Sequence, residues 1–88
     1  MTVVFSRRFV NEYHKLTIDQ QAKTKEVLQR LPEAWTKRKQ SGLKIKKMIN
    51  HNKIYEARID RQFRVTFQVD GETITMRRVG THAIYRKP

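Results

Sequence analysis

The hydrophobic pattern in the N-terminal part of the chain predicts one strand followed by two helices. Residues 2–6 (TVVFS) form a short β-prone run, and Ser6 is placed to cap the helix that follows. Apolar residues then recur at helical intervals in two sets: Phe9, Val10, Tyr13 and Leu16, and then Ile18, Ala22, Leu28 and Leu31. The second helix should begin near Thr17 and end at or just before Pro32, or continue for one more turn with Trp35 packed onto the core.

After His51 and Asn52 the pattern changes to a period of two residues, which is typical of strands. Three runs follow this period: 54–59, 63–69 and 72–79. The stretch 36–47 ahead of them carries six basic residues and no acidic one, and we expect it to form a loop. These basic residues are Lys37, Arg38, Lys39, Lys44, Lys46 and Lys47. The order β-α-α-β-β-β predicts a single α+β domain, residues 1–88, with the two N-terminal helices packed on one face of a small, mostly antiparallel β-sheet.

The dipeptide Asp70-Gly71 is a strong signal for a two-residue hairpin turn, and such a turn fixes the register of the strands on either side. The pairs that follow are Phe67–Ile74 and Val65–Met76 on an apolar face, and Gln68–Thr73, Thr66–Thr75 and Arg64–Arg77 on the other face. The apolar face must pack against the helices, and the other face should be solvated. Val79 breaks the alternation, so we expect the last strand to end or bulge there.

Two arginines directly opposite each other repel, and folding alone gives no reason to place them so. A bound phosphate would relieve the repulsion of Arg64 and Arg77, because the guanidinium fork matches phosphate geometry. The polar parity of the preceding strand places Arg58 near the same face. His82 follows Gly80, a residue that can turn the chain back over the strand ends. Positive charge nearby would favour the neutral imidazole that a general base requires.

The net charge is the strongest compositional signal. Twenty basic and eight acidic residues give +12, which favours nucleic acid as the partner over an anionic membrane surface or an acidic protein. The sequence has no long apolar run and no signal-peptide pattern, so we expect no membrane association and a cytoplasmic location. The absence of cysteine excludes disulfides, thiolate zinc sites and cysteine nucleophiles. Without a carboxylate-rich metal motif, a phosphate-binding glycine loop or a serine elbow, we expect no metal and no small-molecule cofactor.

The chain resembles the RelE/ParE superfamily of type II toxin-antitoxin toxins. The resemblance covers nearly the whole chain and rests on its element order and on five segments: 43–47 (LKIKK), 54–58 (IYEAR), 63–67 (FRVTF), 78–82 (RVGTH) and 83–85 (AIY). It implies that RelE-like members cleave mRNA on the ribosome and are neutralised by an antitoxin, whereas ParE-like members inhibit DNA gyrase. It also implies that Arg64 matches the strand arginine of the RelE-like enzymes, His82 their catalytic position after the Val-Gly turn, and Tyr85 their C-terminal tyrosine. Position 82 is histidine where some relatives have arginine.

The leading hypothesis is therefore a toxin that cleaves mRNA in the ribosomal A site without a metal, leaving a 2′,3′-cyclic phosphate and a 5′-hydroxyl. His82 would act as base or acid, and Arg64 and Arg77 would stabilise the phosphorane. Tyr85 would orient the nucleotide by stacking or assist proton transfer. The expected RNA-binding residues are Lys37, Arg38, Lys39, Lys44, Lys46, Lys47, Arg58 and Arg78. The expected partners are a cognate antitoxin, the ribosome and mRNA. The alternatives are a ParE-like gyrase inhibitor without catalysis and a generic basic RNA-binding module.

Overall fold

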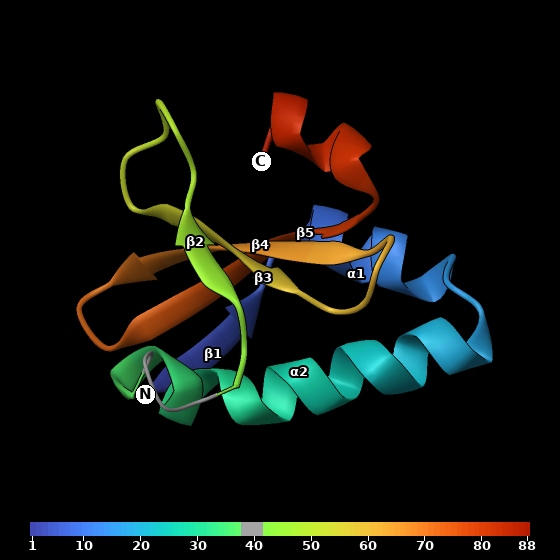
Figure 1. Ribbon diagram of the computed structural model, residues 1–88, viewed down its shortest axis with the longest axis horizontal. Coiled ribbons are helices and arrows are strands. Elements are labelled where there is room, and N and C mark those ends of the chain that lie inside the picture. Colours follow the sequence, from blue (N-terminus) through green and yellow to red (C-terminus); the bar gives the residue numbers. More distant parts are fainter. Residues whose placement is uncertain (38–41) are drawn as a thin grey trace.

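The computed structural model describes residues 1–37 and 42–88 and contains a five-stranded sheet with helices on both faces (Figure 1). The elements in chain order are β1 (Thr2–Phe5), α1 (Arg7–His14), α2 (Ile18–Thr36), β2 (Ile45–Lys47), β3 (Ile54–Arg58), β4 (Arg64–Asp70), β5 (Thr73–Gly80) and the 3₁₀ helix η2 (His82–Arg86). The spatial order of the strands is β1-β5-β4-β3-β2. The two α-helices pack on one face, and η2 lies on the other, so the predicted α+β class is confirmed.

The sheet differs from the prediction at both of its edges. β1 pairs with β5 in parallel, which makes the sheet mixed, while the other three strand pairings are antiparallel. The expectation of a loop up to residue 47 was wrong for Ile45–Lys47, which forms β2 and pairs with β3. A strand of three residues with two lysines is too short for its alternation to be detected.

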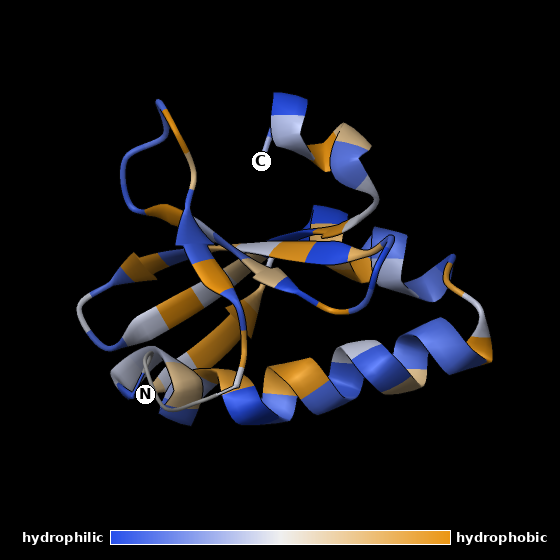
Figure 2. Ribbon diagram, viewed as in Figure 1, coloured by the Kyte–Doolittle hydropathy of each residue, from blue (hydrophilic) through white to orange (hydrophobic). Residues whose placement is uncertain are grey.

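The core lies between α2, α1 and the inner face of the sheet. Buried residues come from both layers: Phe9, Val27, Leu31 and Ala34 from the helices, and Ala57, Val65, Phe67, Ile74, Met76 and Val79 from the strands. Figure 2 shows the corresponding apolar bands on the strands. These strand residues are the apolar face that the period of two predicted, so the sheet presents the expected side to the helices.

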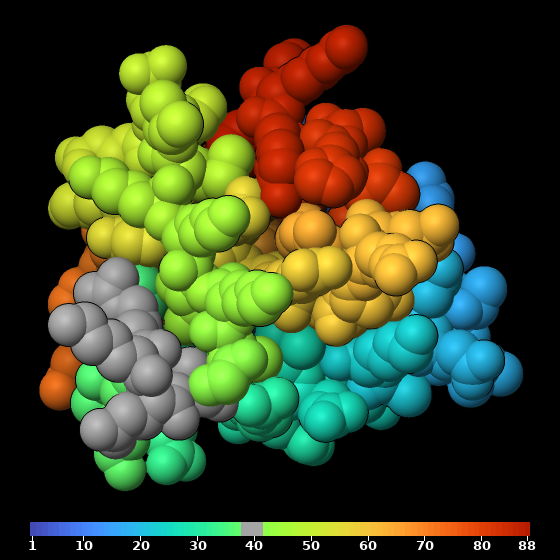
Figure 3. Space-filling view, in the orientation of Figure 1, coloured from blue at the N-terminus to red at the C-terminus, as the bar shows by residue number. Residues whose placement is uncertain are grey.

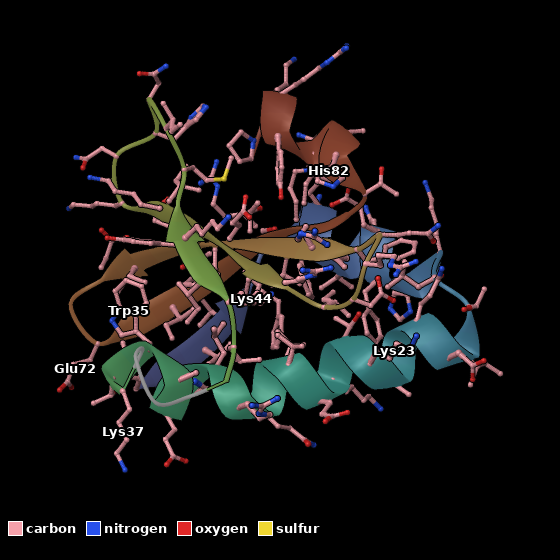
Figure 4. The ribbon with its side chains drawn as sticks, viewed as in Figure 1. Lys23, Trp35, Lys37, Lys44, Glu72 and His82 are labelled. Atoms are coloured by element: carbon pink, nitrogen blue, oxygen red, sulfur yellow. The ribbon has the colours of Figure 1, made fainter. Side chains whose placement is uncertain are left out.

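Helix α2 continues past Pro32 to Thr36, so the earlier end is wrong and the alternative of one more turn is correct. Proline in a helix loses one backbone hydrogen bond, which here would have reached the carbonyl of Leu28. That turn brings the Trp35 ring to 4.5 Å from Tyr55 and 5.9 Å from Phe67 (Figure 4). The burial of three aromatic rings against one another outweighs the lost hydrogen bond.

The hairpin between β4 and β5 turns one residue later than predicted. Asp70 pairs with Thr73, so the two central residues of the turn are Gly71 and Glu72. Gly71 has a positive φ of 58°, and a turn with glycine at its first central position needs no positive φ at the second. The pairing of Arg64 with Arg77 is therefore wrong, because Arg64 faces Gly80.

A β-bulge in β5 changes the register a second time. Phe67 pairs with Met76 but Thr66 pairs with Arg78, which leaves Arg77 as the extra residue. The expected irregularity is real, although it lies two residues before Val79. The Ser6 hydroxyl, which caps α1 by accepting from the Phe9 amide, also donates to the Arg77 carbonyl at 2.9 Å. The N-terminus of α1 therefore holds the bulge in place.

The outer face of the sheet is covered over its middle, which corrects the expectation that it is solvated. Thr66 is fully buried there, and its hydroxyl donates to the Pro88 carbonyl at 2.8 Å. The chain folds back onto this face immediately after Gly80, where a Cβ would lie only 2.8 Å from Cγ2 of the buried Ile84. Glycine at this position allows η2 to lie directly on the sheet.

Candidate nucleic-acid cleft

An open cleft of about 490 Å³ lies between the β2–β3 hairpin and η2. In the space-filling view these two segments, yellow-green and red, rise on either side of it (Figure 3). The lining residues are Lys44, Lys46, Lys47, Met48, Ile49, Glu56, Arg58, Arg64, His82 and Tyr85. Five of them are cationic lysines or arginines and one is acidic, so the cleft carries a strong positive potential.

Two arginines meet at the floor of the cleft. Arg58 and Arg64 are cross-strand partners on β3 and β4. The Arg58 amide donates to the carbonyl of Lys44, just before β2, and so points away from β4. Arg58 and Arg64 therefore form a non-hydrogen-bonded pair, the type of cross-strand pair in which the two side chains lie closest. Arg64 is only 8% exposed. The predicted pair of Arg64 with Arg77 is therefore absent, and Arg64 instead lies opposite Arg58.

The turn after β3 fixes the directions of both guanidinium groups. The Asp60 carbonyl accepts from Arg58 Nε at 3.2 Å and from Arg64 Nη1 at 2.6 Å. The Asp60 carboxylate accepts from the amides of Gln62 and Phe63, both at 2.9 Å, which holds the turn rigid. Partial burial acts to raise the Asp60 pKa, but these two amides and Lys23 outweigh it and leave the pKa lowered. Asp60 thus keeps the two arginines preorganised.

Tyr85 connects η2 to the floor of the cleft. Burial, together with a hydrogen bond to the Glu56 carboxylate, raises its pKa, and a hydrogen bond from Arg64 partly opposes this. The phenol is therefore neutral near pH 7. Glu56 of β3, Arg64 of β4 and Tyr85 of η2 thus line the same part of the cleft, and the first two both influence the phenol.

His82 stands at the rim of the cleft, exposed to solvent. Its ring meets the edge of Tyr85 with the centroids 5.1 Å apart and the planes at 85°. It is the first residue of η2, and the Thr81 hydroxyl caps this helix by accepting from the Ala83 amide. Figure 4 shows His82 on η2 and Lys44 just before β2, the two segments that flank the cleft.

Several residues predicted to act in the site lie elsewhere. Arg77 donates to the Pro88 carbonyl and to Gln68, and it does not line the cleft. Arg78 forms an ion pair of 2.6 Å with Glu12 of α1. Lys37 lies at the end of α2, 3.6 Å from the Glu33 carboxylate and away from the cleft. The predicted Arg38 and Lys39 lie outside the described residues.

Sequence reasoning did not single out three lining residues, the apolar Met48 and Ile49 and the acidic Glu56, and of these Glu56 alone is ionisable. It stands between Lys46 of β2 and Thr66 of β4 in the sheet. The alternation that placed Arg58 on the outer face applies equally to Glu56, two residues earlier, so the signal was present. In the sequence, a single glutamate among arginines and lysines looks like ordinary surface charge. Its place in the cleft becomes apparent only from the structure, which puts Tyr85 beside it.

The described part of the chain contains no helix long and apolar enough to cross a membrane. Residues 1–37 and 42–88 also contain no cluster of three or more histidine, aspartate or glutamate side chains arranged to hold a metal ion.

Comparison with known proteins identifies the fold. No family model matches the sequence, and no curated protein is detectably similar to it. Solved structures are similar over nearly their whole length. RelE in the RelB-RelE antitoxin-toxin complex of Methanococcus jannaschii superposes with a TM-score of 0.69 at 24% identity, over 97% of this chain and 99% of that one. The chain has the fold of the RelE toxins. The fold that the sequence resemblance implied is thereby confirmed.

Two further structures show how widely the RelE fold is shared. The intact RelBE toxin-antitoxin complex of E. coli gives a TM-score of 0.72 at 18% identity, covering 91% of this chain and 94% of that one. The YoeB/ParE toxin of Agrobacterium tumefaciens gives 0.71 at 15% identity, with coverages of 93% and 99%. The RelE-like fold therefore includes toxins under both the RelE and the ParE name. The fold alone does not distinguish their activities, so the distinction has to be drawn from the residues of the cleft.

Proposed function

We propose that the protein is the toxin of a type II toxin-antitoxin system and acts as a ribosome-dependent mRNA endonuclease in the cytoplasm. The observation that supports this most is the convergence in one basic cleft of two preorganised arginines, a carboxylate and an imidazole. An inhibitor that only binds a protein target requires no such combination of phosphate-binding and proton-transferring groups.

The cleavage step follows from these groups. Glu56 accepts the proton of the 2′-hydroxyl as its oxygen attacks the adjacent phosphorus. Arg64 and Arg58 stabilise the charge that develops on the phosphorane oxygens. The bond to the 5′-oxygen breaks as His82 donates a proton to that oxygen. The products are a 2′,3′-cyclic phosphate and a 5′-hydroxyl, and no metal takes part.

Tyr85 and the lysines serve binding and orientation. The Tyr85 phenol holds the Glu56 carboxylate, while its ring offers a surface against which a nucleobase can stack. Lys44, Lys46 and Lys47 form the wall contributed by β2 and the residues just before it. Their contacts to phosphates give affinity without sequence preference. Exposed lysines along the cleft wall are suited to binding the phosphate backbone of an RNA strand.

The decisive experiment compares translated and untranslated copies of one transcript after induction of the protein, with cleavage mapped by primer extension. We expect cuts in phase with the codons on the translated copy alone, and their loss in His82→Gln. Lys15→Gln, which changes an exposed charge remote from the cleft, is the matched control and should cut like the wild type. Growth arrest without any cut, accompanied by inhibited DNA supercoiling, would instead identify a ParE-like gyrase inhibitor.

We also propose a cognate antitoxin as partner. A charge of +12 and an exposed cleft lined with lysines suit an acidic protein as an inhibitor. The RelE proteins of M. jannaschii and E. coli were both solved in complex with RelB. Copurification of this chain with the product of an adjacent gene as a stoichiometric complex would support the proposal. Harmless, monomeric protein after expression alone would contradict it.

A further inference from the structure

The tip of the β2–β3 hairpin places an exposed isoleucine in the wall of the cleft. Ile49 lines the cleft and is 83% exposed, and the cleavage step proposed above uses no part of it. Single apolar residues on a surface are ordinary, and Ile18 at the start of α2 is equally exposed at 84%. The two differ in their location, because Ile18 does not line the cleft. Ile49 is thus an apolar side chain open to water inside a basic cleft.

The backbone of the hairpin fixes this isoleucine in position. Asn50 and Lys53 have positive φ angles of 65° and 63°, which are uncommon for residues other than glycine. The Lys53 carbonyl accepts from the Val69 amide of β4 at 3.1 Å, and its Nζ forms an ion pair of 3.3 Å with Asp70. Unusual backbone angles persist only where the surrounding structure determines them. The hairpin therefore holds Ile49 at the cleft through its backbone, without packing of the isoleucine side chain.

The opposite wall of the cleft is aromatic. It is formed by η2, where the rings of His82 and Tyr85 meet edge to face with their centroids 5.1 Å apart. The floor between the two walls carries the guanidinium groups of Arg58 and Arg64. A nucleotide has the same division, since its base has two flat faces that stack and its phosphate is anionic. The cleft volume of about 490 Å³ lies within the range of pockets that bind small molecules, so the cleft has room for one base.

We propose that Ile49 contacts one face of a nucleobase in the bound RNA, while the other face of that base lies against Tyr85. The proposal rests on the proposed function, to which it adds a residue that positions the substrate. An aliphatic side chain excludes water from the face of a base but forms no hydrogen bond with its edges. Ile49 should therefore favour any base over none, and a large purine over a pyrimidine, without reading a defined sequence.

The neighbouring lysines bind RNA by a different interaction. Lys44, Lys46 and Lys47 contact phosphates, and a phosphate is the same whether or not its nucleotide carries a base. Removing a base from the RNA therefore removes the contact with Ile49 and leaves the contacts of the lysines in place. This difference makes the base contact measurable.

The test uses the whole protein and a labelled 2′-deoxy oligonucleotide of about six nucleotides, which binds without being cleaved. In a matched series, one nucleotide at a time is abasic, so its base is absent and its phosphate remains. Fluorescence anisotropy gives the affinity of each oligonucleotide for the wild type and for Ile49→Ser. We expect Ile49→Ser to bind the complete oligonucleotide about fivefold to tenfold more weakly. At one abasic position the two proteins should bind equally, because the contact is then absent from both.

Two further variants control this comparison. Ile18→Ser removes an equally exposed isoleucine outside the cleft and should bind every oligonucleotide as the wild type does. Ile49→Phe offers a larger apolar surface and should bind the complete oligonucleotide at least as tightly as the wild type. All three variants should keep the melting temperature of the wild type within a few degrees, because both positions are exposed. In cleavage of message, Ile49→Ser should raise the RNA concentration needed for the half-maximal rate more than it lowers the rate at saturation.

The possible results separate this proposal from the proposed function. An Ile49→Ser defect of the same size on the complete oligonucleotide and on every abasic one would overturn the base contact, and so would the absence of any defect. Loss of binding to phosphatidylglycerol vesicles in Ile49→Ser, with its RNA affinity unchanged, would assign Ile49 to a membrane surface instead. In each of these cases intact cleavage would leave the endonuclease standing. A base-dependent defect in a protein that cleaves no message would overturn the endonuclease alone, and a wild type that binds none of the oligonucleotides would overturn both.

Discussion

Single residues in the cleft owe their orientation to groups that never meet a substrate. Asp60 is the clearest example, since its carbonyl holds both Arg58 and Arg64 and its carboxylate holds the turn that carries the carbonyl. A catalytic arginine with a fixed guanidinium stabilises transition-state charge without reorganising. The effect of changing Asp60 should therefore appear in stability and in activity together.

The lowered pKa of Asp60 gives stability a defined dependence on pH. Because the folded-state pKa lies below that of an unperturbed aspartate, the stabilisation is fully present above the unfolded pKa and is lost as the pH falls through the folded pKa. Replacing Asp60 by Ala should cost about 1 kcal/mol at pH 7, as for a lost capping carboxylate. Urea unfolding of both proteins between pH 2 and pH 7 measures this. The difference in unfolding free energy between the two proteins should narrow below about pH 4. A difference that does not change with pH would exclude the carboxylate as its source.

Glu56→Gln separates proton transfer from binding. The amide keeps a hydrogen bond with Tyr85 but does not accept a proton, so single-turnover cleavage should fall about 10²- to 10⁴-fold. Loss of one negative charge from a basic cleft should leave RNA affinity equal or slightly higher. Anisotropy with a non-cleavable 2′-deoxy oligonucleotide measures the affinity. Cleavage at the wild-type rate would show that Glu56 only neutralises charge.

At this scale the sequence predicted part of the cleft. The predicted site residues Arg64, His82 and Tyr85 all line one cleft. Arg77 could not be placed correctly, because its position depends on a bulge that Ser6 and the C-terminal segment hold. Those contacts are distant in sequence, and no local pattern encodes them.

Among the elements, the short helix η2 depends most on a single close approach. A Cβ on Gly80 would lie 2.8 Å from Cγ2 of Ile84, so Gly80→Ala must displace η2 or β5. Overpacking of this kind costs about 1–3 kcal/mol. Because η2 carries His82 and Tyr85, cleavage should fall further than stability alone explains. Thermal unfolding and single-turnover cleavage measure the two effects.

A second substitution checks this cause. Leucine has no Cγ2 branch, so Ile84→Leu in the Gly80→Ala background should restore part of the stability and of the activity. Ile84→Leu alone should be close to neutral, because the volume is conserved. Absence of any rescue would mean that the backbone of Gly80, rather than the contact, is what matters.

The strands show why periodicity predicts elements better than it predicts their alignment. A period of two located β3, β4 and β5 and their buried faces, since hydrophobic burial is read locally. The register depends on which residue of the turn takes the positive φ, and Gly71 takes it at the first central position. A turn displaced by one residue moved Arg64 away from Arg77. The parallel pairing of β1 with β5 joins strands that are far apart in the sequence, so no local pattern predicts it.

For the whole molecule, the distribution of charge should govern how tightly RNA is held. Changing both Lys46 and Lys47 to Gln removes two cations from the cleft wall, so the slope of log affinity against log salt should flatten by about 1.4, or about 0.7 for each lost phosphate contact. The matched control, Lys37→Gln, removes a cation already paired with Glu33 outside the cleft and should leave the slope nearly unchanged. Titration of a non-cleavable oligonucleotide at several salt concentrations measures both. Equal slopes for all three proteins would place the RNA elsewhere.

The pairing of the first strand with the last also sets an order of events during synthesis. Residues Thr2–Phe5 have their partner in Thr73–Gly80, and α1 is tied to the same late strand through Glu12 and Arg78. Contacts so distant in sequence form late, because the intervening chain must first be made and closed into a loop. His82 and Tyr85 follow β5 in the chain, so they emerge from the ribosome later still. A nascent chain therefore carries no assembled cleft until β5 and η2 have been synthesised, because these two elements supply its late-forming contacts and one of its walls.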